Sequence, residues 1–148
     1  MSTYTQILYH IIFSTKNREP VLDEAHRDDF YRFTWGVLEK RQCHSYRIGG
    51  IEDHVHIFTS VHPSIALSDL VKEIKTSASA WIKGRSVFPR FTHWQEGYGA
   101  FTLGWAGKDA LIEYIRHQKN HHRKETFREE YERLLEEAGL SINPEYDP

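Results

Sequence analysis

The sequence contains only one cysteine, Cys43. A single thiol can form no disulfide within the chain and cannot supply a zinc-thiolate cluster, so any metal chemistry must use other side chains. No apolar run approaches the roughly 20 residues that a membrane-spanning helix needs, so we expect no membrane partner. The first six residues have no basic start and no long apolar segment, so we expect no secretory signal and a cytoplasmic protein.

Strong net charge is also missing, because the chain of 148 residues has a formal net charge of only −2. The distribution is uneven, however. Residues 125–148 contain eight acidic and two basic residues, whereas residues 1–124 contain 13 acidic and 17 basic residues. A basic body can bind phosphates whatever the total charge. Hydrophobic residues make up 39% of the chain, so we expect one globular domain over residues 1–148, with 124–148 as an acidic helical extension.

Apolar periodicity and turn residues predict an α+β fold. Strands are expected at residues 4–13, 44–50 and 54–61, and a glycine-marked turn followed by a fourth strand at 92–103. Helices are expected at 23–40, 68–83, 108–122 and 125–138. Asp23 and Ser68 are the expected N-caps, and Gly49-Gly50 is the expected turn or bulge. This order is typical of the ferredoxin-like (split βαβ) fold, a four-stranded antiparallel sheet with helices on one face, here followed by a C-terminal helix. Its first and third strands form the central pair.

The third predicted strand carries two histidines, His54 and His56, on either side of Val55. Residues two apart on a strand share a face, so the two imidazoles point the same way. Such a pair is half of a metal site or a pair of phosphate contacts, but by itself it favours a polar sheet face, because two ligands do not make a site. The neighbouring Asp53 could orient an imidazole or simply form the turn.

The predicted helix 108–122 carries Tyr114 and Gln118, which lie four residues apart and therefore share one helical face. A tyrosine hydroxyl can attack phosphorus, and a glutamine oxygen can serve as a third metal ligand beside two histidines. Spacing alone favours a core-edge tyrosine with a surface glutamine. Imidazole ligands suit zinc or manganese better than magnesium.

Candidate phosphate contacts lie in two places. Lys16 and Arg18 follow the first strand, which the predicted topology places beside the histidine strand, and Lys72 and Lys75 lie on the helix 68–83. Each of these cations could also belong to an ordinary solvated surface.

Taken together, these motifs resemble the single-tyrosine HUH transposases, the group of insertion sequences 200 and 605 and of the REP-associated tyrosine transposases. The HUH motif is His54-Val55-His56, and the tyrosine motif is Tyr114-Ile115 followed by Gln118. Further similar stretches are Thr15-Lys16-Asn17-Arg18, Trp94-Gln95 with Gly97-Tyr98, and His121-His122-Arg123-Lys124. The resemblance covers nearly the whole chain in the right order.

The resemblance implies an enzyme that cuts and rejoins single-stranded DNA with hairpin or palindromic ends. Tyr114 would hold the 5′ phosphate as a phosphotyrosine, and His54, His56 and Gln118 would bind Mg²⁺ or Mn²⁺. It also implies a homodimer acting at the bacterial or archaeal nucleoid, in which the tyrosine helix can serve either subunit.

Two alternative functions make different demands on the sequence. A non-catalytic module on the same fold, such as a domesticated transposase, could bind single strands by stacking bases on exposed sheet aromatics, for which Tyr4, Tyr9, Phe58 and Tyr98 are candidates. A histidine-triad nucleotide hydrolase needs a further histidine at position 58, which is Phe58, and is excluded.

Overall fold

A four-stranded antiparallel sheet lies at the centre of the computed structural model, which describes residues 1–142. The strand order is β2-β3-β1-β4, so the first and third strands form the central pair, and the predicted α+β fold class is confirmed. The strands are β1 (Leu8–Ser14), β2 (Ser45–Gly50), β3 (His54–Ser60) and β4 (Gly99–Leu103). The last six residues of the expected acidic extension, 143–148, lie outside the described residues.

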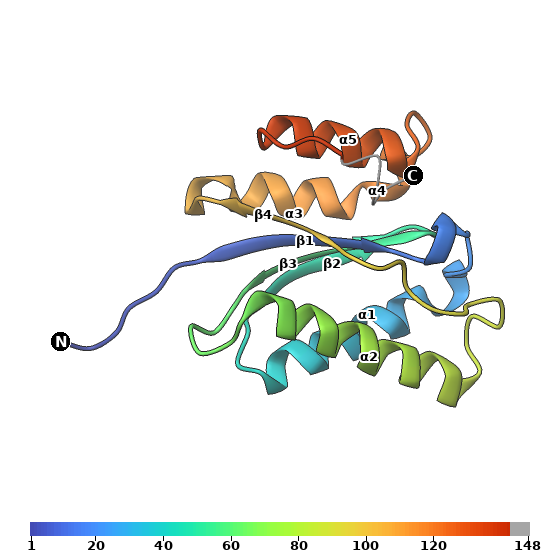
Figure 1. Ribbon diagram of the computed structural model, residues 1–148, viewed down its shortest axis with the longest axis horizontal. Helices are drawn as coiled ribbons and strands as arrows, with labels where there is room; N and C mark the ends of the chain where they lie inside the picture. Colours follow the sequence, from blue (N-terminus) through green and yellow to red (C-terminus); the bar gives the residue numbers. More distant parts are fainter. Residues whose placement is uncertain (143–148) are drawn as a thin grey trace.

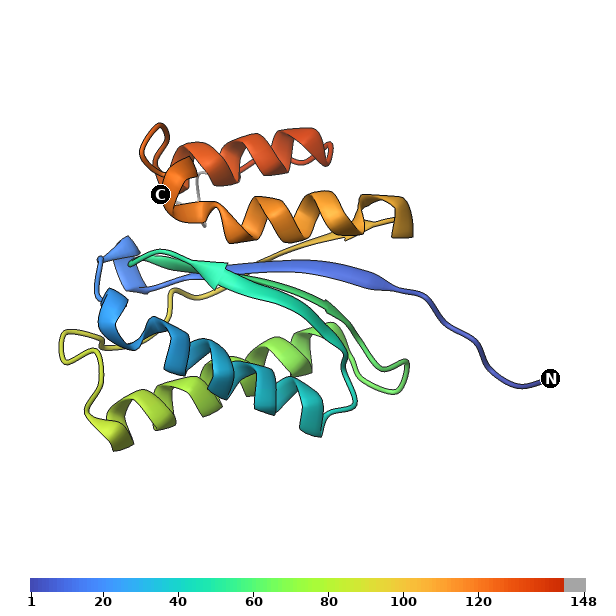
Figure 2. The same cartoon turned by 180° about the vertical axis from the view of Figure 1, so that it is seen from behind.

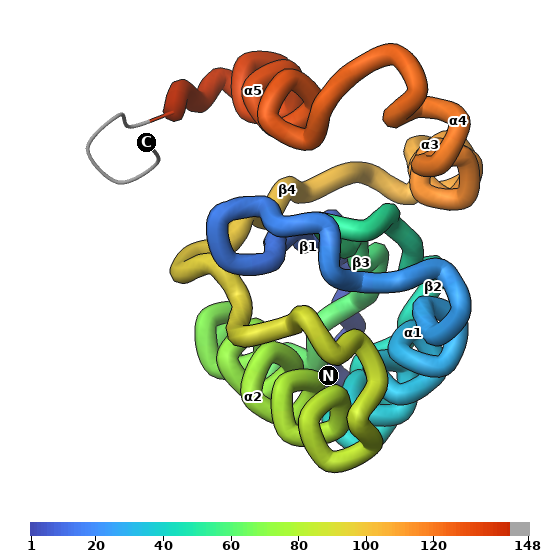
Figure 3. The backbone as a smooth tube through the Cα atoms, turned by 90° about the vertical axis from the view of Figure 1, so that its right-hand side faces the viewer, coloured from blue at the N-terminus to red at the C-terminus, as the bar shows by residue number. Residues whose placement is uncertain are grey.

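Helices cover both faces of this sheet (Figures 1 and 2). One face packs against α1 (Glu24–Lys40) and α2 (Leu67–Arg85). The other lies under α3 (Lys108–Arg116), α4 (Gln118–His121) and α5 (Phe127–Glu137). Seen end-on, α5 lies over β4 while α3 and α4 lie beside it (Figure 3). Two short 3₁₀ turns complete the chain, η1 (Lys16–Arg18) and η2 (Trp105–Gly107).

The two faces differ in chemistry because side chains alternate along each strand. Val55 and Ile57 of β3 join Ile11 and Phe13 of β1 in the large apolar core under α1 and α2. The opposite face has a smaller apolar cluster, Leu8, Phe58 and Ile115, at one end of β3. The remainder of that face is therefore available for polar groups. Among the described residues, no helix is long and apolar enough to cross a membrane.

Several predicted element boundaries were wrong. The first strand begins at Leu8 rather than residue 4, because Leu8 already pairs with Ser60, the last residue of β3. The N-cap of α2 is Ala66 and not Ser68, because the Ala66 carbonyl already accepts the N–H of Leu70.

One glycine-rich segment differs from expectation. Gly49 and Gly50 lie within β2 and pair with β3, so the turn is formed by residues 51–53. The fourth strand follows its glycine-marked turn as predicted and starts at Gly99, while the loop before it bonds to the chain at the end of β1. There the N–H of Gln95 donates to the carbonyl of Ser14 at 2.9 Å.

Gly49 allows α3 to approach the sheet closely. A Cβ at this position would lie 2.8 Å from Ile115 Cγ2 and 3.0 Å from the Ile115 carbonyl oxygen. Any larger residue must therefore push α3 away from β2.

We predict that Gly49→Ala lowers the free energy of unfolding by about 1–3 kcal/mol, as expected for overpacking against backbone. The matched control is Gly36→Ala within α1, where an added Cβ meets nothing within 4 Å. Alanine there should stabilise the helix by about 0.5–1 kcal/mol. Denaturant unfolding measures both effects, and equal stability of the Gly49 variant and the parent would contradict the close packing of α3.

Candidate functional site

The two histidines of β3 point to the face covered by α3, α4 and α5. His54 and His56 are both 0% exposed, whereas Val55 between them packs into the opposite core, as the strand alternation predicted. Their Nε2 atoms lie 3.1 Å apart. Fully buried imidazoles must have polar partners, so the neighbouring elements decide what this pair can do.

Strand β1 contributes a third histidine, His10, that sequence reasoning missed. In the β1–β3 register Ile12 lies opposite His56, which places His10 on the same face two residues along. Its Nε2 lies 2.7 Å from Nδ1 of His56, and the two rings stack at 5.0 Å between centroids. Only the strand register could have revealed this contact, since His10 is 46 residues away in the chain.

The predicted helix 108–122 is interrupted. Helix α3 ends at Arg116, and His117, with φ −98° and ψ 20°, separates it from α4, so the expectation of one continuous helix was wrong. Gln118 Oε1 nevertheless lies 3.1 Å from His54 Nε2. The ring of Tyr114 lies edge-on to that of His56, 5.9 Å between centroids. The candidate nucleophile and the candidate ligands therefore meet within one chain.

Glu130 of α5 lies at the centre of the cluster and was not predicted. It is 0% exposed, and its Oε1 lies 3.1 Å from His54 Nε2, 3.3 Å from His56 Nε2 and 2.9 Å from His122 Nε2. Its Oε2 accepts a hydrogen bond from Gln118 Nε2 at 2.9 Å and another from the Tyr114 hydroxyl. In the sequence Glu130 is one of many acidic residues near the end of the chain, so no local signal distinguished it.

Helix α5 is held in place by its start and by one aromatic contact. Thr126 forms a capping box with Glu129, which sets the first turn, and this turn begins at Phe127 rather than at residue 125. Phe127 then stacks on His54 with 4.1 Å between ring centroids. These two features place Glu130, three residues further on, against the histidines.

Burial and partners set the protonation of the imidazoles. Burial, and secondarily the neighbouring His56, lowers the pKa of His10 to about 3. Burial likewise lowers the pKa of His56 to about 4, despite its hydrogen bond to Glu130. Burial also acts against the charged form of His54, but hydrogen bonds to Asp53 and Glu130 outweigh it and raise the pKa of His54 to about 9. The cluster therefore contains both neutral and readily protonated imidazoles around one carboxylate.

The accessible edge of the site is formed by Tyr114, His121 and Arg133. Arg133 Nη2 donates to the Tyr114 hydroxyl oxygen at 2.8 Å and to the carboxylate of Glu125 at 2.9 Å. The Arg133 side chain keeps 36% of its exposure and that of His121 keeps 31%. Burial and the hydrogen bond to Glu130 raise the pKa of the Tyr114 phenol, whereas Arg133 opposes that shift.

The donor atoms fit a divalent metal ion. His54 Nδ1 donates to the Asp53 carboxylate at 2.7 Å, so its Nε2 faces the cluster, and Asp53 has the orienting role that the sequence left open. His56 Nδ1 is likewise engaged by His10. Metal-binding histidines usually have their second nitrogen held in this way. Together with Gln118 Oε1, the two Nε2 atoms form the three-donor set predicted from the sequence.

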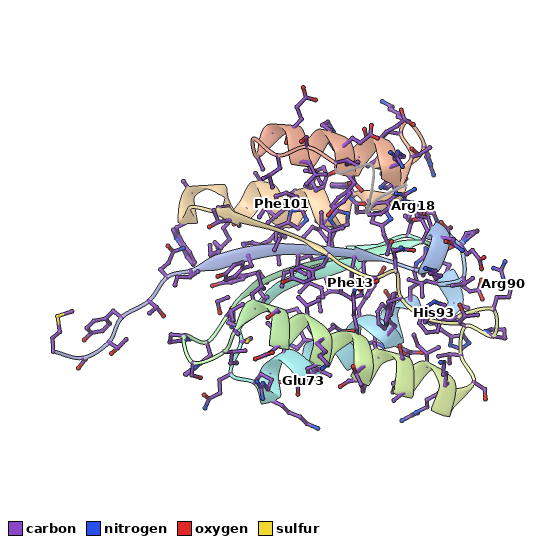
Figure 4. The ribbon with its side chains drawn as sticks, viewed as in Figure 1. Phe13, Arg18, Glu73, Arg90, His93 and Phe101 are labelled. Carbon is purple, nitrogen blue, oxygen red and sulfur yellow. The ribbon has the colours of Figure 1, made fainter. Side chains whose placement is uncertain are left out.

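Three of the four predicted DNA-contacting cations line two neighbouring cavities. Arg18 lines a cavity of about 300 Å³ together with Gln95, Tyr98 and Tyr131. Figure 4 shows Arg18 at the same end of the molecule as His93 in the loop before β4. Lys72 and Lys75 line a second cavity of about 540 Å³, although Lys75 also donates to the carbonyls of Gln95 and Gly97. Lys16 lies on η1 next to Arg18 and lines neither of these cavities.

Comparison with known proteins agrees with this architecture. Two solved structures share the fold. One is a candidate transposase from Deinococcus radiodurans R1, with a TM-score of 0.62 and 21% identity over 80% of this chain and 95% of that chain. The other is a REP-associated tyrosine transposase bound to a REP hairpin, with a TM-score of 0.60 and 15% identity over 82% of this chain and 74% of that chain. No curated protein matches the sequence significantly. The family described as "Transposase IS200 like" matches residues 3–118, so the chain belongs to the IS200-like transposase family.

Proposed function

We propose that this protein is a metal-dependent transposase that cuts and rejoins single-stranded DNA through a covalent tyrosine intermediate. The observation that carries the proposal is the convergence of Tyr114 with His54, His56 and Gln118 on one face of the sheet. A buried set of metal-type donors beside a half-exposed phenol is what phosphoryl transfer to tyrosine requires. Membership of the transposase family supports the same reaction class.

In the proposed reaction the Tyr114 oxygen attacks a phosphorus atom of the DNA backbone. The bond to the 3′ oxygen breaks, leaving a free 3′ hydroxyl, and the 5′ phosphate stays on the tyrosine. The phenol gives up its proton, and the leaving 3′ oxygen gains one. Reversal at a new junction restores the phosphodiester, so no external energy source is consumed.

The residues around Tyr114 have distinct roles in this scheme. Glu130 Oε2 accepts the hydrogen bond of the phenol and so orients the hydroxyl. Arg133 donates to the same oxygen and stabilises negative charge on it during proton loss. His121, which is partly exposed beside Tyr114, lies where a phosphate oxygen would approach.

His54, His56 and Gln118 would hold Mg²⁺ or Mn²⁺. The bound ion would supply polarisation of the scissile phosphate and stabilisation of the leaving oxygen. Asp53 positions the imidazole of His54, and His10 that of His56, each through a contact with Nδ1.

A hairpin-forming single strand is the proposed DNA partner. One structural neighbour is described as bound to a REP hairpin. In this chain, Arg18 and the 39%-exposed Tyr98 line one cavity next to α5, where a strand could lie across the phosphate-binding cations. Exposed aromatic and basic side chains are the usual means of binding single strands.

Simple base stacking on an open sheet is not supported. Both sheet faces are covered, and Phe58, one of the four aromatics considered for stacking, is 0% exposed against Tyr46. Tyr4, which is 86% exposed, precedes β1 and lies outside the sheet. Stacking on the sheet through Phe58 or Tyr4 is therefore excluded, whereas Tyr98, which is 39% exposed, is available to an enzyme and to a binding module alike.

We predict that Tyr114→Phe forms no covalent DNA adduct, because the ring remains while the nucleophilic oxygen is lost. The parent, mixed with a hairpin-bearing single strand and Mn²⁺ or Mg²⁺, should give a species that survives boiling in detergent. The label should appear in that species when the fragment 3′ of the cut is labelled, and excess EDTA should prevent its formation.

The matched control for this experiment is Tyr98→Phe, which removes a hydroxyl at the neighbouring cavity and should keep the adduct. Tyr114→Phe should still bind the hairpin about as well as the parent. An adduct of equal yield from Tyr114→Phe, or from the parent in EDTA, would overturn the assigned chemistry.

DNA binding should depend on salt through the cations near β1. Replacing Lys16 and Arg18 together by Ala should weaken hairpin binding and lower the slope of log affinity against log salt by about one for each phosphate that is no longer bound. Fluorescence anisotropy at several salt concentrations measures the slope. Replacing Lys40 and Arg41, which lie at the end of α1 opposite to η1, should leave the slope unchanged, and an unchanged slope in the Lys16 and Arg18 variant would refute this DNA-binding site.

The expected homodimer is a further proposal that rests on the resemblance. Light scattering should give about twice the chain mass of 17.5 kDa. Because Tyr114 and the histidines meet within one chain, mixing a His56→Ala chain with a Tyr114→Phe chain should restore no cleavage. A monomer mass would contradict the dimer, and restored cleavage would indicate that the tyrosine helix is exchanged between subunits.

A further inference from the structure

We propose that Glu130 and His122 bind the same metal ion as the three predicted ligands. The complete site would then be a five-donor site of three imidazoles, one amide oxygen and one carboxylate, and it would select Mn²⁺ over Mg²⁺. This inference rests on the proposed metal-dependent cleavage and extends its ligand set. Both added residues lie beyond residue 118, the last residue that the family match covers.

The five donor atoms converge on one small space. Oε1 of Glu130 lies between 2.9 and 3.3 Å from the Nε2 atoms of all three imidazoles. Gln118 Oε1 lies 3.0 Å from His122 Nε2 and 3.1 Å from His54 Nε2. The donors of His54, His122 and Glu130 alone satisfy the spacing of a metal-binding group. These distances between donors are those of atoms gathered around a shared cation.

The outer nitrogen of each imidazole is bonded so that the inner one can bind a metal. His122 Nδ1 donates to the backbone carbonyl of Glu125 at 2.8 Å, and His54 Nδ1 donates to the carboxylate of Asp53. Both partners can only accept, so the Nδ1 of each ring carries a proton, and Nε2 is the nitrogen that would bind a metal ion in place of its contact with Glu130. His56 Nδ1 lies 2.7 Å from His10 Nε2, a nitrogen that can donate or accept, so the outer nitrogen of His56 is also hydrogen-bonded.

Among the described residues, the buried carboxylate of Glu130 forms ion pairs with imidazoles only. Glu130 is 0% exposed, and no Lys or Arg in residues 1–142 forms an ion pair with it. The adjacent carboxylate of Glu125 is different, because Arg133 already pairs with it at 2.9 Å. A divalent ion would neutralise Glu130 and accept all five donors at once.

The donor chemistry indicates whether the site prefers Mg²⁺ or Mn²⁺. Mg²⁺ prefers oxygen ligands and keeps several of its waters, whereas three imidazoles favour a transition-metal ion. Mn²⁺ accepts both imidazole nitrogen and carboxylate oxygen.

The test is a titration of the protein with Mn²⁺ in the absence of DNA. Binding is measured from the electron paramagnetic resonance signal of the Mn²⁺ that remains free. Glu130→Gln and His122→Asn should each weaken Mn²⁺ affinity by about tenfold or more, and the parent should bind Mg²⁺ more weakly than Mn²⁺. His56→Ala should lose binding, and Glu132→Gln, which removes only a surface partner of Arg128, should bind like the parent. Mn²⁺ should also raise the melting temperature of Glu130→Gln and of His122→Asn by less than it raises that of the parent.

Parent-like Mn²⁺ affinity in folded Glu130→Gln, or in His122→Asn, would overturn the five-donor site. If Glu130→Gln does not fold, His122→Asn decides the question, because its side chain lies at the end of α4 and retains 4% exposure. Should both variants bind normally while His56→Ala does not, the three-donor site and the proposed cleavage would stand. Failure of the proposed function is recognised separately, by adduct formation in EDTA.

Discussion

The antiparallel pairing of β1 with β3 is the constraint on which the rest of the structure depends. Its register places Ile12 opposite His56 and Ser14 opposite His54, so His10 shares a sheet face with both histidines. The same pairing puts Ile11 and Val55 into the apolar core beneath α1 and α2. A slip of one residue would exchange these two sets and bury imidazoles in the apolar core.

Polar side chains can be buried on the face under α3, α4 and α5 because they form hydrogen bonds with one another. His56 contacts His10, His54 contacts Asp53 and Gln118, and the carboxylate of α5 contacts three imidazoles. Such a network costs free energy when any member is removed, since the remaining groups lose their partners in a low-dielectric environment. Helix α5 therefore belongs to the site and is more than an acidic extension.

The position of Tyr114 at the edge of this network connects fold and function. Gly49 lets α3 lie close to β2, and this close approach brings the phenol to the histidines. The phenol is half-buried, with Arg133 and Glu130 on its oxygen. In this member of the IS200-like transposase family, the proposed nucleophile therefore lies beside metal-type donors of the same chain.

Local pattern alone determined the strand alternation of His54 and His56, the four-stranded order with its central pair, and the candidate roles of Tyr114 and Gln118. These follow from side-chain periodicity and from motif resemblance, which act over a few residues. Only the tertiary structure revealed that His10 and Glu130 contact His56, because they are 46 and 74 residues away from it along the chain. It also decided the helix break at His117 and the true start of β1, since backbone pairing with distant segments outweighs local propensity there. A carboxylate in an acidic stretch looks like a solvated surface residue, and only the packing of α5 through Phe127 and Thr126 places it among the imidazoles.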